Sequence, residues 1–425
     1  MKAIEQIAAQ LQGYDPNALR ADTALAFLHN LVTPCSESRL VDLKDSLGCI
    51  LAEDLISPIH VPPHDNSAMD GFAFAGEQIK NGAPLELSVV GTALAGKAWT
   101  GSVGRGHCVK IMTGAVMPTG LDTVVPQELV KQLGANIVIA PDVLQQGDNR
   151  RFKGEDLMQG KPALTAGTRI GPAALGLVAS LGIAKLKVYR RLRVAFFSTG
   201  DEILSLGEVL REGAVYDSNR YTLFGLLNGL GVEVIDMGVV RDDPASLELA
   251  FQNAAQAADA IITSGGVSVG EADHTKAVMR KLAGDGKGVA FWKIAMRPGR
   301  PMAVGHIGKA VLFGLPGNPV AVMVTFLAFV RPTLLRMMGC TTSTAPLLNA
   351  RSAEFIRKKP GRTEYQRGIV TRAADGTLTV ATTGQQGSGV LSSMVQANGL
   401  IVLAHDQSDV LAGQEVAVMM FDGAI

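Results

Sequence analysis

The chain has 425 residues, of which 47% are hydrophobic, so it is long and apolar enough for a globular protein of more than two domains. Lys and Arg together number 39, as do Asp and Glu, so no global charge favours nucleic acid or a membrane surface. The cysteines lack any CxxC pair, which indicates reduced thiols and not a zinc or disulfide framework. The N-terminal residues lack the apolar core of a signal peptide, and the longest apolar run, 320–330, is too short to span a bilayer. We therefore expect a soluble, cytoplasmic protein.

The first part of the chain alternates between short apolar stretches and turn-forming residues. Residues 1–20 have the pattern of a loose amphipathic helix and 23–31 that of a second helix. The polar segment HDNSAMDG (64–71) has the composition of a surface turn, and Thr113 places a hydroxyl on a glycine turn of its own. Short β-type runs alternate with glycines at 85–90, 108–111, 123–125 and 137–139, which predicts a β domain inserted at 61–149.

After this insert the chain returns to the region that it left. A basic and then acidic cluster at 150–156 closes the insert, and a helix at 172–181 and a strand at 185–189 follow. We expect this return to pack on the residues before the insert. Residues 22–60 and 150–190 would then form one discontinuous mixed α/β domain.

From Leu192 onward, strands alternate with helical patterns of about 10–15 residues, which predicts a doubly wound α/β domain at 191–340. The segment YDSN (216–219) is predicted to cap a helix that runs to Leu230, and Asp243 stands at the N-cap position of the next helix. Ligands of such sheets bind beyond the carboxyl ends of the strands. We expect one shared rim for the acids that follow predicted strands, which are Asp201, Glu202, Asp242 and Asp273.

The most distinctive stretch of this domain is the glycine-rich segment that follows its third strand, SGGVSVG (264–270). It precedes a helical pattern at 274–282, and free N–H groups at a helix start bind phosphate. It is neither the nucleotide P-loop nor the dinucleotide motif. Cations follow at Lys293, Arg297 and Arg300, and residues 341–425 return to short β runs typical of a small barrel or sandwich.

Nine blocks occur in order along the chain: DNSAMDG, MTGA, STGDE, YDSN, RDDP, SGGVSVGEAD, RPGRP, GLPGNP and QGS. On these blocks, from about Asp22 to its end, the chain resembles the molybdopterin molybdenumtransferases, and it is similar to the E domain of gephyrin. The resemblance implies a multi-domain α/β plus β fold: a central doubly wound α/β molybdopterin-binding domain, an inserted β domain, a discontinuous mixed domain and a C-terminal small β-barrel. It implies magnesium-dependent cleavage of adenylylated molybdopterin in the presence of molybdate, releasing AMP and molybdenum cofactor.

The resemblance also assigns roles by position. The family's catalytic residues fall on Asp70, Thr113, Glu202, Asp242 and Asp273. The candidate substrate-binding residues are Ser264, Gly265, Gly266, Ser268, Gly270, Pro316, Gly317 and Asn318. The candidate molybdate-binding residues are Lys293, Arg297, Pro298, Arg300, Arg367 and Ser388. Asp242 and Asp273 would hold Mg²⁺, a cation that takes one or two carboxylates together with waters and phosphates.

Two positions depart from the family pattern. Arg297 stands where the family more often has lysine, which exchanges a point charge for a planar fork of donors. Ala321 stands where a serine is common, so a hydroxyl is missing there.

Alternatives remain open at this point. A molybdopterin adenylyltransferase would share the α/β domain but would need only residues 191–340, and a scaffold of gephyrin type would need none of the acids. Each acid could also be only a helix cap or a turn residue. Because Asp70 and Thr113 lie in the inserted domain and Asp242 and Asp273 in the α/β domain, we expect sites shared between the subunits of a homodimer. Other proteins of molybdenum cofactor synthesis are further candidate partners.

Overall fold

The structure, a computed structural model, describes residues 4–267, 274–284 and 288–422. These residues form two compact units. The larger unit falls within residues 1–52, 167–171 and 186–425, and the inserted unit within residues 53–166 and 172–185.

The inserted unit is built around a sheet that is buried on both faces. Side chains alternate across a strand, so Phe72 and Phe74 pack with Leu87 on one face while Ala73 packs with Val109 on the other. The β runs predicted between residues 85 and 139 are all strands of this sheet. In the order β7–β4–β6–β5–β9–β8, its strands are β7 (Thr123–Pro126), β4 (Gly71–Phe74), β6 (His107–Ile111), β5 (Leu85–Ala93), β9 (Asn136–Ile139) and β8 (Val130–Leu133).

The chain that leaves the insert pairs with the chain that enters it. In the larger unit, β1 pairs with β12, and Leu51 forms a bridge to Val188. In the inserted unit, β2 pairs with β11 and β3 with β10. The predicted return is therefore present as strand pairing. The elements of this region are β1 (Ser38–Asp42), η1 (Leu43–Ser46), β2 (Leu55–Ile56), β3 (Asn66–Ser67), η2 (Gly76–Gln78), η3 (Gln127–Leu129), β10 (Arg150–Arg151), β11 (Pro162–Leu164), α3 (Pro172–Ser180) and β12 (Lys185–Tyr189).

The larger unit is centred on a mixed sheet. In the order β16–β13–β17–β21–β20–β18, its described strands are β16 (Glu233–Val240), β13 (Arg193–Thr199), β17 (Ala260–Ser264), β21 (Ala310–Leu315), β20 (Pro301–Ile307) and β18 (Val289–Lys293). The first four strands run parallel, so their carboxyl ends share one edge. Only β20 of these six described strands runs the other way, so β18, which is antiparallel to β20, also ends at this edge, where Lys293 lies opposite Pro301, the first residue of β20.

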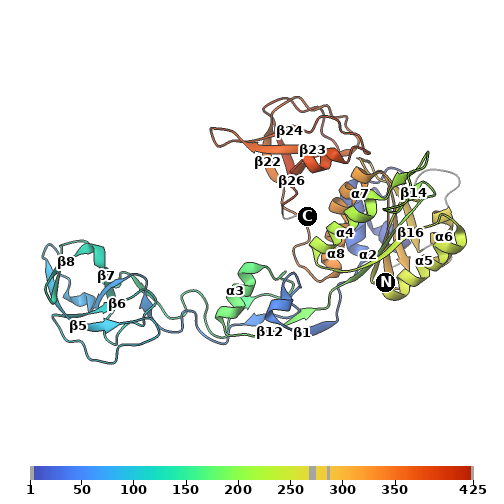
Figure 1. The fold of residues 1–425 in the computed structure, drawn as a ribbon. Helices are drawn as coiled ribbons and strands as arrows, with labels where there is room; N and C mark the ends of the chain where they lie inside the picture. The colour runs from blue at the N-terminus through green and yellow to red at the C-terminus, as the bar shows by residue number, and fades with distance from the viewer. Residues whose placement is uncertain (1–3, 268–273, 285–287, 423–425) are drawn as a thin grey trace. The chain divides into compact units, whose positions relative to one another are not determined.

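Helices cover both faces of this sheet, as the doubly wound prediction requires (Figure 1). Val194 and Phe196 of β13 pack with α4 (Ser218–Leu230), whereas Ala195 and Phe197 pack with α5 (Pro244–Ala257) and with the cluster that includes α6 (His274–Leu282). The predicted caps are confirmed: Asp217 accepts a hydrogen bond from the Arg220 N–H at the start of α4, and Asp243 caps α5. Gly231 ends α4 in the left-handed conformation, with φ of 85°.

A long apolar helix packs within this core. It consists of α7 (Pro319–Thr325), a π-helical turn η4 (Phe326–Val330) and α8 (Arg331–Met337). The predicted apolar run 320–330 is part of this longer helix, and by length and composition alone the described span Pro319–Met337 could cross a membrane. Its most apolar window is 89% buried inside the structure, so it is a core helix of the α/β domain.

The C-terminal region forms a closed β-barrel, as predicted from its short β runs. Five of its described strands close in the order β23–β24–β22–β26–β25, and β25 pairs back with β23. β19 (Met296–Arg297), which comes from the α/β domain, adds to the barrel beside β23. The elements are β22 (Leu348–Ser352), β23 (Thr363–Arg372), β24 (Leu378–Thr382), α9 (Ser392–Gln396), β25 (Gly399–Leu403) and β26 (Glu415–Met420).

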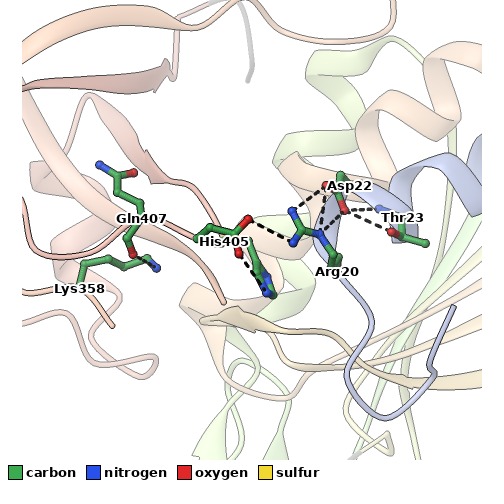
Figure 2. A network of polar contacts seen from close by, with 7 residues as sticks. Arg20, Asp22, Thr23, Lys358, His405 and Gln407 are labelled. Atoms are coloured by element: carbon green, nitrogen blue, oxygen red, sulfur yellow. Dashed lines mark hydrogen bonds and ion pairs between the residues drawn. The ribbon is translucent and has the colours of Figure 1, made fainter. Parts of the chain in front are cut away.

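The N-terminal segment packs on the α/β domain. α1 (Ile4–Gln10) buries Ile7, and Tyr14 accepts a hydrogen bond of 3.0 Å from the Trp292 indole. Before α2 (Ala21–Leu31), Arg20 forms ion pairs with Asp22 at 3.3 Å and with Asp406 of the barrel domain at 3.4 Å (Figure 2). The N-terminal segment thus contacts both the α/β domain and the barrel domain.

Candidate functional site

A cavity of about 530 Å³ lies in the larger unit, where loops at the carboxyl edge of the sheet meet the barrel domain. Three segments form its walls: the turn after β18, the turn after β21 and the barrel-domain loop 386–388. The lining residues are Met296, Arg297, Pro298, Gly299, Arg300, Pro301, Pro316, Gly317, Asn318, Ala321, Arg362, Gln386, Gly387 and Ser388. The sequence reasoning placed seven of these residues in the site: Arg297, Pro298, Arg300, Pro316, Gly317, Asn318 and Ser388.

Three arginines give this cavity a positive charge. Arg297 and Arg300 come from the α/β domain, and neither has an ion-pair partner among the described residues. Arg362 comes from the barrel domain, and its Nε donates a hydrogen bond of 2.8 Å to the Glu364 carboxylate. The Glu364 side chain is only 3% exposed and also accepts a bond from Gln366, so it holds Arg362 in place. Arginine forks suit tetrahedral oxyanions, because each presents several fixed N–H donors.

Arg362 was missed by the sequence reasoning, which selected Arg367 from the same segment. A usable signal was present: Arg362, Glu364 and Gln366 alternate with Arg367 and therefore share the other face of the strand. Arg367 does not line the cavity. Its guanidinium is buried and bonds to backbone carbonyls of the loop that carries Ser388.

Lys293 also lies outside the cavity lining. It is the last residue of β18, its side chain is exposed, and its backbone bonds to Pro16 and Leu19 of the N-terminal segment. Its ladder partner Pro301 lines the cavity, so the backbone of Lys293 lies beside the cavity wall although Lys293 itself is not part of the lining.

The glycine loop lies beside the cavity at the same edge. Gly265 has φ of +90°, and a Cβ there would lie 2.4 Å from the Thr199 carbonyl oxygen, so only glycine fits. The Gly265 N–H donates to the Leu315 carbonyl and is not free for phosphate. A Cβ on Gly317 of the cavity wall would lie 3.9 Å from the Gly265 Cα, so the two turns are neighbours. Ser268 and Gly270 lie outside the described residues.

A buried polar network supports the turns that contain Gly265 and Gly317. The Ser198 hydroxyl lies 2.9 Å from both the Asp217 carboxylate and the Ser264 hydroxyl. Burial raises the pKa of Asp217, although hydrogen bonds from the Arg220 N–H and from Ser198 oppose this. Asn219 donates a bond of 2.7 Å to the Gly317 carbonyl. The start of α4 therefore fixes both loops.

Asp242 is the described candidate for a magnesium ligand. It is half-buried two residues after β16, and Thr275 of α6 donates a hydrogen bond of 3.4 Å to it. The N-cap of α5 is the neighbouring residue Asp243, so Asp242 is not required for capping. Asp273 lies outside the described residues but immediately precedes α6. A hard carboxylate oxygen beside a phosphate-binding edge fits Mg²⁺, which needs only one or two such ligands.

Glu202 is exposed in the loop after β13, and its carboxylate lies over Gly200, where a Cβ would meet Oε2 at 2.6 Å.

In the inserted unit, Asp70 and Thr113 are brought together: the Thr113 N–H and hydroxyl donate to Asp70 Oδ1 at 2.6 and 2.7 Å. The N–H and then the hydroxyl of Thr113 lower the pKa of Asp70. These catalytic candidates therefore lie in two different units.

Comparison with known proteins gives a consistent answer along the chain. Residues 19–182 match the family described as MoeA N-terminal region (domain I and II), residues 195–336 a probable molybdopterin binding domain, and residues 349–421 the MoeA C-terminal region (domain IV). The molybdopterin molybdenumtransferase of Haemophilus influenzae is 40% identical over 91% of this chain and 95% of its own length. That of Nostoc sp. is 35% identical over 96% of this chain and 95% of its own length.

Solved structures agree with these sequence relatives. The crystal structure of the molybdopterin biosynthesis moeA protein from Pyrococcus horikoshii OT3 superposes with a TM-score of 0.78 at 27% identity, over 95% of this chain and all of that one. The N-terminal and C-terminal matches lie outside the α/β domain, which is all that a stand-alone adenylyltransferase would need. This chain belongs to the molybdopterin molybdenumtransferase family, and its fold is the MoeA fold.

Proposed function

We propose that this chain inserts molybdenum from molybdate into adenylylated molybdopterin and releases AMP and molybdenum cofactor, the last step of molybdenum cofactor synthesis. One observation carries the proposal: three arginines and Ser388 surround a cavity at the carboxyl edge of an α/β sheet. Molybdate is a tetrahedral dianion, and donors of this kind bind such anions. The phosphoanhydride of the adenylylated substrate needs a second set of anion contacts, which we assign to the neighbouring turn at 316–318.

The residues divide into two groups by their chemistry. Arg297, Arg300, Arg362 and Ser388 bind the oxyanion, because they line the cavity with hydrogen-bond donors. Asp242, together with Asp273, would hold Mg²⁺, which when bound neutralises phosphoryl oxygens. Asp70 and Glu202 are exposed carboxylates available to the substrate. Ala321, which stands where the family commonly has serine, lines the cavity. The site therefore lacks the hydroxyl donor that a serine would provide there.

The test is a reaction with purified components. Adenylylated molybdopterin is incubated with the protein, molybdate and Mg²⁺, and AMP release is followed. We expect AMP release that depends on molybdate. ATP consumption with free molybdopterin would instead indicate an adenylyltransferase, and binding without turnover would indicate a scaffold.

We further propose a homodimer, whose interface includes an exposed apolar segment of the larger unit. This segment surrounds β14 (Ile203–Leu204) and β15 (Val215–Tyr216), which pair with each other, and continues into α4. Its most exposed apolar side chain, Val209, is 88% accessible to solvent. A large exposed apolar surface is typical of a contact with another protein. The exposed side chains are Leu206, Val209, Leu210, Val215, Tyr216, Tyr221 and Phe224.

The cellular setting follows from the same proposal. The four cysteines are free, as expected for reduced thiols of a cytoplasmic protein. Adenylylated molybdopterin must come from an adenylyl-transfer reaction, so proteins that make this substrate are candidate partners.

A further inference from the structure

The backbone that carries Arg362 is held on both sides of this residue. On the amino side, the Gly361 N–H donates a hydrogen bond of 2.9 Å to the His405 carbonyl. On the carboxyl side, the Thr363 N–H donates one of 2.9 Å to the Ala295 carbonyl. His405 belongs to a loop of the barrel domain, whereas Ala295 belongs to the α/β domain. Both domains therefore determine where Arg362 lies in the cavity wall.

The barrel loop, residues 404–409, is bound to the segment before Arg362 by a buried cation. Lys358 is only 2% exposed, and its ammonium group donates a hydrogen bond of 3.1 Å to the Gln407 carbonyl (Figure 2). The Lys358 N–H donates to the Asp409 carboxylate at 2.6 Å. A buried ammonium is costly to leave without hydrogen bonds. The barrel loop is therefore held firmly against residues 358–361.

Two consecutive residues of the N-terminal segment contact both of these supports. Leu19 is buried, and its carbonyl accepts a hydrogen bond of 2.7 Å from the Ala295 N–H. The next residue, Arg20, forms an ion pair of 3.4 Å with Asp406 of the barrel loop (Figure 2). The N-terminal segment thus joins the α/β support to the barrel support, which closes a ring of contacts around Arg362.

We infer that Arg20 is a positioning residue for Arg362, because its ion pair with Asp406 fixes the barrel side of the cavity against the α/β side. Neither Arg20 nor Asp406 lines the cavity, so both act through the backbone that carries Arg362. This inference rests on the proposed function, since it assumes that an oxyanion binds in the cavity.

The size of the effect follows from the exposure of the ion pair. The Arg20 and Asp406 side chains are 42% and 81% exposed. Exposed ion pairs change an equilibrium by about two- to fivefold. Loss of this pair should therefore leave the protein folded and weaken anion binding by a similar factor.

Two neutralising variants separate positioning from a simple effect of charge. Through their charges alone, Arg20→Gln would weaken the binding of an anion, whereas Asp406→Asn would strengthen it. A positioning pair predicts that both variants weaken binding, and that the double variant is no weaker than either single variant. Asp375→Asn is the matched control, because Asp375 is an exposed aspartate between β23 and β24 of the same domain.

Three quantities are measured: calorimetric binding of molybdate alone, the molybdate dependence of AMP release, and hydrogen exchange of the amides at 361–363. For Arg20→Gln, Asp406→Asn and the double variant, we expect about two- to fivefold weaker molybdate binding and similarly faster exchange. At saturating molybdate, kcat should stay within about twofold of the wild type, because only binding is affected. The Asp375→Asn control should match the wild type. In an Arg362→Gln background, Arg20→Gln should cause no further loss of molybdate binding.

Three outcomes would overturn the inference. If Asp406→Asn binds molybdate as tightly as the wild type or more tightly, the ion pair does not position the site. If exchange at 361–363 is unchanged in both single variants, the pair does not hold the backbone of Arg362. If Arg20→Gln weakens binding further in the Arg362→Gln background, Arg20 acts elsewhere.

Failure of the proposed function gives a different result. If the wild type releases no AMP, the proposed function fails, but hydrogen exchange at 361–363 and calorimetric binding of molybdate alone still decide whether Arg20 positions Arg362.

Discussion

Arg362 immediately precedes β23 and Arg367 lies five residues further on within it, yet only Arg362 lines the cavity. An odd separation places two strand residues on opposite faces, so a motif that contains both arginines cannot give both the same role. Positional resemblance alone assigned the anion to Arg367. The alternation of Arg362 with Arg367 shows that the two arginines lie on different faces, but which of these faces lies toward the cavity depends on how the barrel closes.

At the residue scale, we predict that Asp242→Asn lowers AMP release by at least about 10- to 100-fold, since a hydrogen bond or metal contact to a charged group is lost. Asp243→Asn is the matched control. It changes the neighbouring acid in the same way, but asparagine caps a helix as well as aspartate does, so its turnover is expected to match the wild type. Steady-state AMP release by both variants, with circular dichroism to verify folding, checks this. Equal activity of Asp242→Asn and the wild type would show that Asp242 has only a structural role.

Among the elements, those with both a periodic apolar pattern and a chemical start or stop signal were predicted closely. α4 begins within the predicted capping segment 216–219, α5 begins after the predicted cap Asp243, and β12 covers the residues expected of it. The sequence pattern predicts a strand at 232–235, whereas β16 runs on to Val240, because the strand continues through Gly238, and strand propensity treats a glycine as a break. Strand ends depend on pairing with neighbours, which residue-by-residue propensity does not include.

Gly265 gives an element-scale prediction with an internal control. Gly265→Ala places a methyl group 2.4 Å from the Thr199 carbonyl oxygen at φ of +90°, so the loop must move. We expect a loss of about 2 kcal/mol or more in the free energy of unfolding, together with loss of activity. Gly317→Ala meets nothing closer than 3.9 Å, so its stability should stay within about 0.5 kcal/mol of the wild type. Urea denaturation measures both variants, and equal stabilities would show that the loop adapts freely.

A second element-scale prediction concerns the amino ends of β13 and β17. Asp259, just before β17, accepts two bonds of 2.7 Å from Arg190 and one of 2.8 Å from the Arg193 N–H. Burial alone would raise the pKa of Asp259, but Arg190 and the Arg193 N–H lower it below its usual value. Because the folded-state pKa is the lower one, the stabilisation is complete above the unfolded pKa and is lost as the pH falls through the folded pKa.

We therefore expect the free energy of unfolding of Asp259→Asn to be about 1–3 kcal/mol lower than that of the wild type at pH 7. This loss is smaller than for a fully buried ion pair, because Asp259 is partly exposed. The difference from the wild type should stay constant down to about pH 5 and shrink below about pH 4. Urea denaturation at pH 7, 5 and 4 measures it. A difference that grows on acidification would contradict this assignment.

For the whole molecule, the prediction is that each active site uses residues of two subunits. Asp70 and Thr113 lie in the inserted unit, and Glu202 and Asp242 in the larger unit. Inactive Asp70→Asn and inactive Asp242→Asn proteins are dissociated, mixed and reassociated. If sites are shared, each heterodimer has one site with both acids intact, so we expect AMP release to recover in the mixture.

The control is each variant taken through the same dissociation and reassociation alone, which should stay inactive. Differently tagged subunits verify that heterodimers form. A mixture that contains heterodimers and remains inactive would show that every site is built within one subunit.

The fold class and the order of the regions could be predicted from the sequence, because the hydrophobic periodicity changes between the β regions and the α/β region. The placement of residues 1–31 was not readable. α2 packs in the core of the α/β domain with α8, and Ile7 of α1 joins the same core, although neither contributes to the sheet. Helical periodicity shows that a helix has an apolar face but does not show which partner covers it.

The strand pair β19–β23 joins two parts of the chain that a sequence reader would separate into modules. Met296 and Arg297 belong to the α/β domain by position, yet their ladder partners Thr363 and Glu364 begin the barrel, and the Thr363 N–H also donates to the Ala295 carbonyl. A protein cut before the barrel would leave this backbone unpaired at the cavity wall, as an edge open to pairing with other chains. The two domains are consequently not interchangeable parts: a barrel grafted from a relative would have to bring a matching strand edge as well as matching side chains.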